Sequence, residues 1–178
     1  MKKGFTLIEL LISMTIFSIV MVSVINLFSA GIKTQRKTLA LQTLSNSTSY
    51  VIEYMSRSIR MAKKDLGGTY ISAGCNFEPA DDEKNYIKFL NYNGKEQEFK
   101  LDNEQIKERK ELASELTALT SDNFKVNKLV FRVSGGCQQN DELQPKVTIV
   151  IEIQTKEAEP QILNLQTTIS QRDLDVKY

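Results

Sequence analysis

The sequence predicts an α+β fold, in which a long N-terminal α-helix packs on an antiparallel β-sheet. Three patterns support this prediction. Residues 10–30 carry no charge, residues 40–62 repeat apolar side chains at steps of three, four or seven, and apolar side chains after Gly68 alternate with polar ones. The first two patterns are typical of a helix, and the third is typical of strands with one buried face.

Length and composition favour one globular body with an appendage. The chain has 178 residues, a formal net charge of +1 and no histidine. Its longest Lys/Arg runs are only pairs such as Lys63-Lys64, so direct nucleic-acid binding is not predicted. The sequence also lacks a Gly-x-Ser-x-Gly elbow and a phosphate loop, and we therefore predict neither an enzyme nor a cofactor.

The uncharged run predicts a membrane span. It has 21 residues, and a helix that rises about 1.5 Å per residue then covers roughly 30 Å, the thickness of the hydrocarbon core. Hydroxyl side chains inside such a span can bond back to their own helix, so they do not exclude it. The polar residues of the run are Ser13, Thr15, Ser18, Ser23, Asn26 and Ser29.

An ordinary secretory signal peptide is the alternative for this segment, because it also joins a basic start to an apolar middle. Such a peptide is cut after the apolar middle at a small-x-small site, for which the best candidate is Phe28-Ser29-Ala30. The bulky Phe28 occupies a position that requires a small residue. The cleavage site is therefore expected elsewhere.

A more specific pattern precedes the apolar run. Residues 2–11 read Lys-Lys-Gly-Phe-Thr-Leu-Ile-Glu-Leu-Leu, and this order of residues resembles the type IV prepilin class. The resemblance implies cleavage between Gly4 and Phe5 by a membrane aspartic prepilin peptidase, followed by N-methylation of Phe5. Glycine suits that position, because it lets the backbone extend into a protease cleft. A flexible glycine before a helix would explain Gly4 alone, but not the whole run.

Glu9 is the most informative single residue of this segment. An ionised carboxylate beside an apolar helix is costly unless it is paired. The resemblance supplies a partner, the amine of Phe5 in an adjacent subunit, which would fix the axial register between helices. The alternative is an acid in the headgroup zone that is favoured by the helix dipole.

We expect four segments along the chain. They are a cleaved leader at residues 1–4, a transmembrane and assembly half of the helix at 5–30, an amphipathic half at 31–64, and a β-rich body at 65–178. Gly67-Gly68 is expected to end the helix. The apolar stripe of the amphipathic half consists of Ala40, Leu44, Val51, Met55, Ile59 and Ala62.

Alternating apolar residues predict the strands of the body. Residues 87–89 and 99–101 flank Asn93-Gly94, a strong hairpin signal. A further strand is expected at 129–133. Residues 146–155 form the clearest strand, and 163–169 are expected to pair with it across a loop that holds Pro160.

The body has two groups of candidate site residues. Cys75 and Cys137 lack the C-x-x-C spacing or histidine partners of a zinc or redox site, so they are candidates for a disulfide, with free buried thiols as the alternative. Four acids, Glu78, Asp81, Asp82 and Glu83, could bind calcium only if they converged. Because they lack the spacing of a calcium loop, we predict a solvated turn and no metal.

The resemblance implies a structural subunit, a minor pilin or pseudopilin of a type IV pilus, type II secretion or DNA-uptake filament. Its partners would be other pilin subunits, the prepilin peptidase, the inner-membrane assembly platform and, before assembly, the lipid bilayer. The chain would cross the inner membrane once, with an extracytoplasmic body. Residues 163–172 loosely resemble the last strand of J-type pseudopilins. The alternatives are a membrane-anchored extracytoplasmic binding module or adhesin and, less favoured, an anchored hydrolase.

Overall fold

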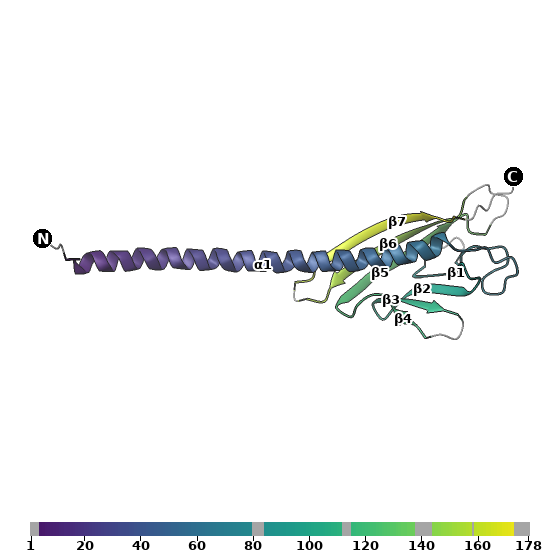
Figure 1. Ribbon diagram of the computed structural model, residues 1–178, viewed down its shortest axis with the longest axis horizontal. Helices are drawn as coiled ribbons and strands as arrows, with labels where there is room; N and C mark the ends of the chain where they lie inside the picture. The colour runs from purple at the N-terminus through teal and green to yellow at the C-terminus, as the bar shows by residue number, and fades with distance from the viewer. Residues whose placement is uncertain (1–3, 80–83, 112–114, 138–143, 158, 173–178) are drawn as a thin grey trace. The chain divides into compact units, whose positions relative to one another are not determined.

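A computed structural model describes residues 4–79, 84–111, 115–137, 144–157 and 159–172. Within these ranges the chain forms one long helix, α1 (Leu7–Arg60), followed by seven strands (Figure 1). The helix passes from a first compact unit, Met1–Ala40, into a second, Leu41–Tyr178. The strands are β1 (Tyr86–Leu90), β2 (Glu96–Asp102), β3 (Gln105–Lys110), β4 (Thr117–Ala118), β5 (Phe124–Ser134), β6 (Lys146–Thr155) and β7 (Ile162–Ser170).

The strands form two antiparallel sheets, with the orders β1-β2-β3-β4 and β5-β6-β7. The α+β class is confirmed, although the sequence predicted a single sheet. The hairpin prediction is also confirmed, because β1 and β2 pair across a turn in which Gly94 has a φ of 75°. Glycine is favoured there, since a side chain strains a backbone with positive φ.

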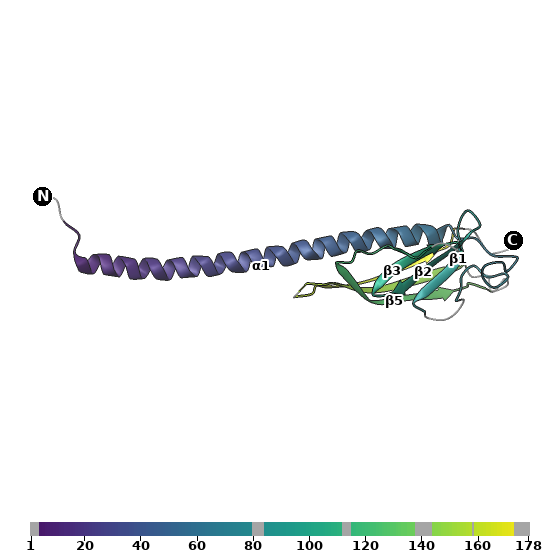
Figure 2. The ribbon, with the colours of Figure 1, turned by 90° about the horizontal axis from the view of Figure 1, so that it is seen from below.

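One hydrophobic core joins the second half of α1 to both sheets (Figure 2). Leu44, Val51, Met55 and Ile59 of α1 are buried, which confirms most of the predicted stripe. They contribute to the same core as the inward face of β6, whose four large residues are at most 1% exposed. Burial of this stripe, rather than helix propensity, is what stabilises the second half of α1.

Helix α1 ends earlier than the sequence predicted. It stops at Arg60 instead of Lys64, and Gly67 and Gly68 lie in the loop that follows. The chain leaves the helix because Lys63 N donates to the carbonyl of Leu90 at 2.9 Å and so extends the edge of β1. The prediction that the glycine pair ends the helix is therefore wrong.

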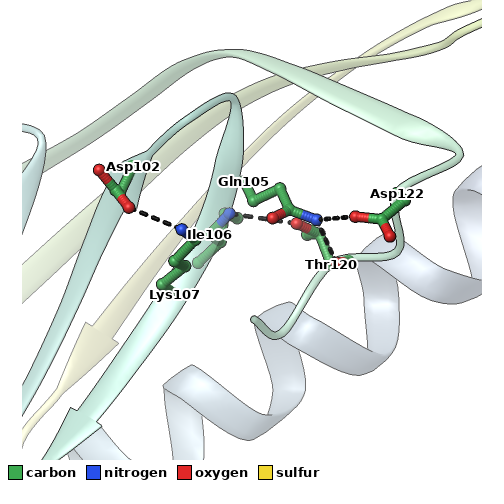
Figure 3. Close-up of polar contacts among 6 residues, drawn as sticks. All are labelled: Asp102, Gln105, Ile106, Lys107, Thr120 and Asp122. Atoms are coloured by element: carbon green, nitrogen blue, oxygen red, sulfur yellow. Dashed lines mark hydrogen bonds and ion pairs between the residues drawn. The ribbon is translucent and has the colours of Figure 1, made fainter. Parts of the chain in front are cut away.

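Polar contacts hold the β4–β5 connection against β3 (Figure 3). The buried Thr120 accepts a hydrogen bond from Ile106 N through its Oγ1 at 3.1 Å. Gln105 Nε2 donates to the Thr120 carbonyl at 3.3 Å and to Asp122 Oδ1 at 2.7 Å. These bonds satisfy buried backbone groups and place the start of β5 beside β3.

Candidate functional site

Thr6 and Glu9 close the start of α1 by reciprocal hydrogen bonds. Thr6 N and Thr6 Oγ1 donate to Glu9 Oε2 at 3.1 and 3.0 Å, and Glu9 N donates to Thr6 Oγ1 at 3.4 Å. This is a capping box, which satisfies donors that a helix start otherwise leaves unpaired. The Thr-x-x-Glu spacing signals such a cap in a sequence, so this contact could have been predicted.

The cap uses one oxygen of the Glu9 carboxylate. Both bonds from Thr6 end on Oε2, and Oε1 accepts no hydrogen bond from the part of the chain that the structure describes. Glu9 is exposed, and Phe5 is 80% exposed. One carboxylate oxygen is therefore available to a donor outside the described chain. The pairing of Glu9 with Phe5 of an adjacent subunit stays a prediction.

Polar side chains within the apolar stretch of α1 bond to the helix itself. Thr15, Ser18 and Ser23 donate to backbone carbonyls three or four residues earlier, at 2.8, 2.8 and 3.0 Å. The prediction of such bonds is confirmed for these three residues. Their hydroxyl groups need no water, so they do not prevent this stretch from lying in lipid.

The apolar side chains of the first unit have no cover within it. Every residue from Gly4 to Leu39 is exposed, and Leu7, Leu27 and Phe28 are at least 70% exposed. A contiguous apolar surface of this length is unfavourable in water. The helix is long and apolar enough to cross a membrane. Its exposed apolar surface therefore fits lipid or other helices as its surroundings.

The same segment is shared with known proteins. Residues 1–25 match the prokaryotic N-terminal methylation motif. The methylation motif supports a type IV pilin-like family and indicates a pilin-like or pseudopilin-like protein. It implies processing by the prepilin peptidase and assembly with other pilin subunits. Together with the apolar helix, it fits a protein that is anchored in the inner membrane and then incorporated into a filament.

The remaining comparisons add no relative. No curated protein and no solved structure matches the chain. The methylation motif favours a structural role over a catalytic one. It covers the first 25 residues, so the β-rich body has to be interpreted from its own contacts.

A disulfide joins two loops of the β-rich body. Cys75, in the loop after α1, is bonded to Cys137, in the loop after β5, across 62 positions of sequence. Beside the bridge, Asn76 N donates to the carbonyl of Gly136 at 2.7 Å. Of the two alternatives that the sequence left open, the structure contains the bridge.

Asp65 organises the first of these loops. Its carboxylate accepts hydrogen bonds from the backbone N–H groups of Gly67, Tyr70 and Ile71 at 3.1, 2.9 and 3.3 Å. Its own backbone N donates to the carbonyl of Cys75 at 2.9 Å. The bonds to the carboxylate hold the pKa of Asp65 below its ordinary value, and the bond from Tyr70 makes the largest contribution.

We predict that Asp65→Asn destabilises the body by about 1–2 kcal/mol at pH 7, because an amide nitrogen replaces an oxygen that accepts backbone N–H groups. The folded pKa is the lower one, so the stabilisation by Asp65 is complete above about pH 4 and disappears as the pH falls through the folded pKa. Guanidinium unfolding of the unaltered chain and of Asp65→Asn between pH 2 and 7 measures the difference in free energy of unfolding. Most pH values are chosen around the ordinary pKa of an aspartate, about 4. A difference that does not shrink in acid would contradict the role of the charge.

A groove of about 600 Å³ lies beside the last turn of α1 and the turn between β1 and β2. Its lining mixes aromatic rings, amides and cations. Sequence reasoning missed it, because its residues come from three separate segments that only the fold brings together. Six of them are Tyr54, Arg57, Met61, Asn91, Tyr92 and Lys110.

Three lining residues of the groove, Tyr54, Gln97 and Lys110, share a network of hydrogen bonds around Glu108. Tyr54 Oη and Gln97 Nε2 donate to Glu108 Oε1 at 2.8 and 2.6 Å. Lys110 Nζ donates to Tyr54 Oη at 2.8 Å and lies 3.4 Å from Glu108 Oε2. Burial raises the pKa of Tyr54, and the bond to Tyr54 raises the pKa of Lys110. Lys110 therefore remains a cation at neutral pH, and the tyrosine remains neutral.

The predicted acidic turn is described only in part. Glu78 N donates to the carbonyl of Lys88 at 2.9 Å, which extends the edge of β1, whereas Asp81, Asp82 and Glu83 lie outside the described residues. Among the residues that are described, no group of three or more His, Cys, Asp or Glu is placed to hold a metal ion. The prediction of a solvated turn is therefore untested.

Proposed function

We propose that this chain is a structural subunit, a minor pilin or pseudopilin, of a type IV pilus, type II secretion or DNA-uptake filament. It assembles through residues 5–30 after cleavage between Gly4 and Phe5 and N-methylation of Phe5. The proposal depends mainly on one observation, the exposed apolar surface of residues 4–39 behind a methylation motif. Before assembly, the lipid of the membrane covers this surface. In a filament, the helices of neighbouring subunits cover it.

The open oxygen of Glu9 supports a specific contact in the filament. A carboxylate that enters a bundle of apolar helices needs a cation beside it. A buried charge without a partner is strongly destabilising, even though the complete pair adds little stability. The N-terminal amine of Phe5, created by cleavage and still cationic after methylation, is a partner of the right charge. Thr6 holds the carboxylate in place while Oε1 receives the amine.

The surroundings of Gly4 support its role as a cleavage residue. A Cβ atom placed on Gly4 would meet nothing within 4 Å. Among the described residues, crowding therefore gives no reason for a glycine at this position. A requirement of the peptidase cleft, where the backbone must approach closely, does give one.

The body belongs outside the cytoplasm in this proposal. Disulfides form and persist in oxidising compartments, so the Cys75–Cys137 bridge supports an extracytoplasmic body. Its partners are other pilin subunits, the prepilin peptidase and the inner-membrane assembly platform. The resemblance of residues 163–172 to J-type pseudopilins favours a minor subunit over the main one.

Filaments sheared from the native host test this function. The chain should be present in filaments from cells with an active prepilin peptidase, and it should stay in the membrane fraction of cells without the peptidase. Absence of the chain from filaments of cells with an active prepilin peptidase would contradict the proposal. The amount of chain in the whole membrane serves as the reference for each strain.

The groove favours a second candidate, a membrane-anchored extracytoplasmic binding module or adhesin. Tyr92 is 62% exposed at its rim, and Lys110 supplies a cation beside the ring of Tyr54. An exposed ring next to polar groups is a common feature of binding sites.

We predict that, if this groove binds sugars, Tyr92→Ala weakens binding to immobilised oligosaccharides about tenfold, the loss typical of an aromatic anchor. Leu66→Ala is the matched control, because Leu66 is 76% exposed and does not line the groove. Binding curves of the purified full chain in detergent provide the measurement. Equal binding by both variants, or no binding by the unaltered chain, would rule out this candidate.

A further inference from the structure

Strand β7 has one edge that pairs with no other strand among the described residues. Strand β7 pairs with β6 along one side, in a register that runs without a break from Lys146↔Ser170 to Gln154↔Ile162. In the same register Thr155 N donates to the carbonyl of Gln161 at 3.1 Å. Because the hydrogen-bonded pairs of an antiparallel ladder occur at every second residue, the odd-numbered residues of β7 turn their backbone groups toward β6.

The even-numbered residues therefore turn their N–H and C=O groups toward the other side. They are Ile162, Asn164, Gln166, Thr168 and Ser170, and all five are exposed. Within the described ranges no backbone hydrogen bond is made on that side until Arg172 N, which donates to the carbonyl of Arg60 at 2.8 Å. A row of five residues is thus ready to accept another strand.

Other strand edges of the described body are shorter or covered. The outer edge of β1 is covered by bridges from Lys63 to Leu90 and from Glu78 to Lys88. The outer edge of β5 is covered in part, because Phe131 exchanges backbone hydrogen bonds with Lys84 and Val126 N donates to the carbonyl of Glu104. Strand β4, at the far edge of its sheet, has only two residues. Short or covered edges are how proteins avoid unwanted strand pairing.

Strand β7 itself carries none of three common protections of an edge, which are charged residues, proline and bulges. Its sequence from Ile162 to Ser170 contains no charged residue and no proline, and its ladder with β6 has no bulge. Its inward side chains Leu163 and Leu165 are only half-buried, whereas Ile151 and Ile153, opposite them on β6, are 1% exposed. An added strand with apolar residues on its inward side would complete the cover of these leucines.

We propose that β7 accepts an extended, uncharged strand of a neighbouring subunit, which pairs antiparallel with it and adds a fourth strand to the β5-β6-β7 sheet. That the neighbour is a filament subunit depends on the function proposed above. A second copy of β7 is not the partner. Residues 41–60 of α1 and β7 run in the same direction (Figure 1), so antiparallel pairing of two β7 strands would point the two helix segments 41–60 in opposite directions.

Photo-cross-linking of the full chain in the native cell envelope tests this proposal. A photoreactive phenylalanine at Asn164 or at Thr168 should cross-link to one segment of another polypeptide, with the two contact points in reversed order along it. The matched control is the same label at Lys128, an exposed residue of β5. Labelling no stronger than that of Lys128, or cross-links between two copies of β7, would overturn the proposal.

Two changes at Gln166 separate backbone pairing from side-chain contact. Gln166→Pro removes an N–H that faces away from β6, so the fold should persist while cross-linking falls about tenfold or more. Gln166→Ala should cross-link as the unaltered chain does, and equal losses in both variants would overturn the proposal. If the proline variant does not fold, Gln166→Lys supplies an edge charge with the same expected loss. A partner strand from a protein without a prepilin leader would contradict the filament proposal but not the strand pairing.

Discussion

Replacing Glu9 by glutamine should lower recovery of the chain in sheared filaments roughly tenfold or more, with cleavage unchanged. Glutamine keeps an oxygen that can accept the bonds from Thr6, so the helix cap persists while the charge is lost. The amine of Phe5 in the adjacent subunit is then left without a counter-ion among apolar helices. Quantitative immunoblots of filaments, normalised to processed chain in the membrane, measure the effect.

A variant of the cap provides the control. Thr6→Val removes the hydroxyl of the capping box but keeps the Glu9 carboxylate and the bond from Thr6 N, so incorporation should fall much less than in Glu9→Gln. Normal incorporation of Glu9→Gln would contradict charge pairing. If Thr6→Val failed to the same degree as Glu9→Gln, Glu9 would be assigned to the cap alone.

Loss of the disulfide has the second large expected effect. Replacing Cys75 and Cys137 together by serine should lower the free energy of unfolding by about 4 kcal/mol, because the unfolded chain regains the entropy of a loop closed across 62 positions. For a body of this size the melting temperature should fall on the order of 10 °C. Thermal and guanidinium unfolding of the full chain in detergent micelles measure both quantities.

Reducing agent gives the control for the disulfide. It should bring the unaltered chain close to the double serine variant, and it should leave that variant unchanged. A variant that unfolds at the same temperature as the unaltered chain under oxidising conditions would show that the bridge contributes nothing. The result does not depend on filament assembly, so it tests the body by itself.

Features that repeat along one element were predictable from the sequence. The spacing of Leu44, Val51 and Met55 gives the buried face of α1, and the alternation from Val147 to Ile153 gives the buried face of β6. Both patterns are local, because the period of the backbone decides which side chains share a face. The methylation motif was recognisable for the same reason, since its residues are contiguous.

Strand β3 could not be predicted in this way. It has a single large apolar residue, Ile106, so it carries no alternating pattern. It becomes a strand because it pairs with β2 and because Tyr54 of α1, 54 positions away, bonds to its Glu108. The end of α1 at Arg60 was missed similarly, since it follows from the pairing of Lys63 with Leu90.

The candidate site also combines local features, which the sequence can predict, with features that only the fold creates. The contact of Thr6 with Glu9 spans three positions and could be read from the sequence. The groove and the open edge of β7 could not, because a groove is assembled from distant segments and an edge is open only if no other segment covers it. Such features require the tertiary register.

The start of the mature chain tests the central claim most directly. Mass spectrometry of the protein from its native host should find a polypeptide that begins at Phe5 and carries a methyl group on its terminal amine. Cleavage at that bond creates the cation that Glu9 is proposed to neutralise. A chain that still begins at Met1, in cells with an active prepilin peptidase, would contradict the account.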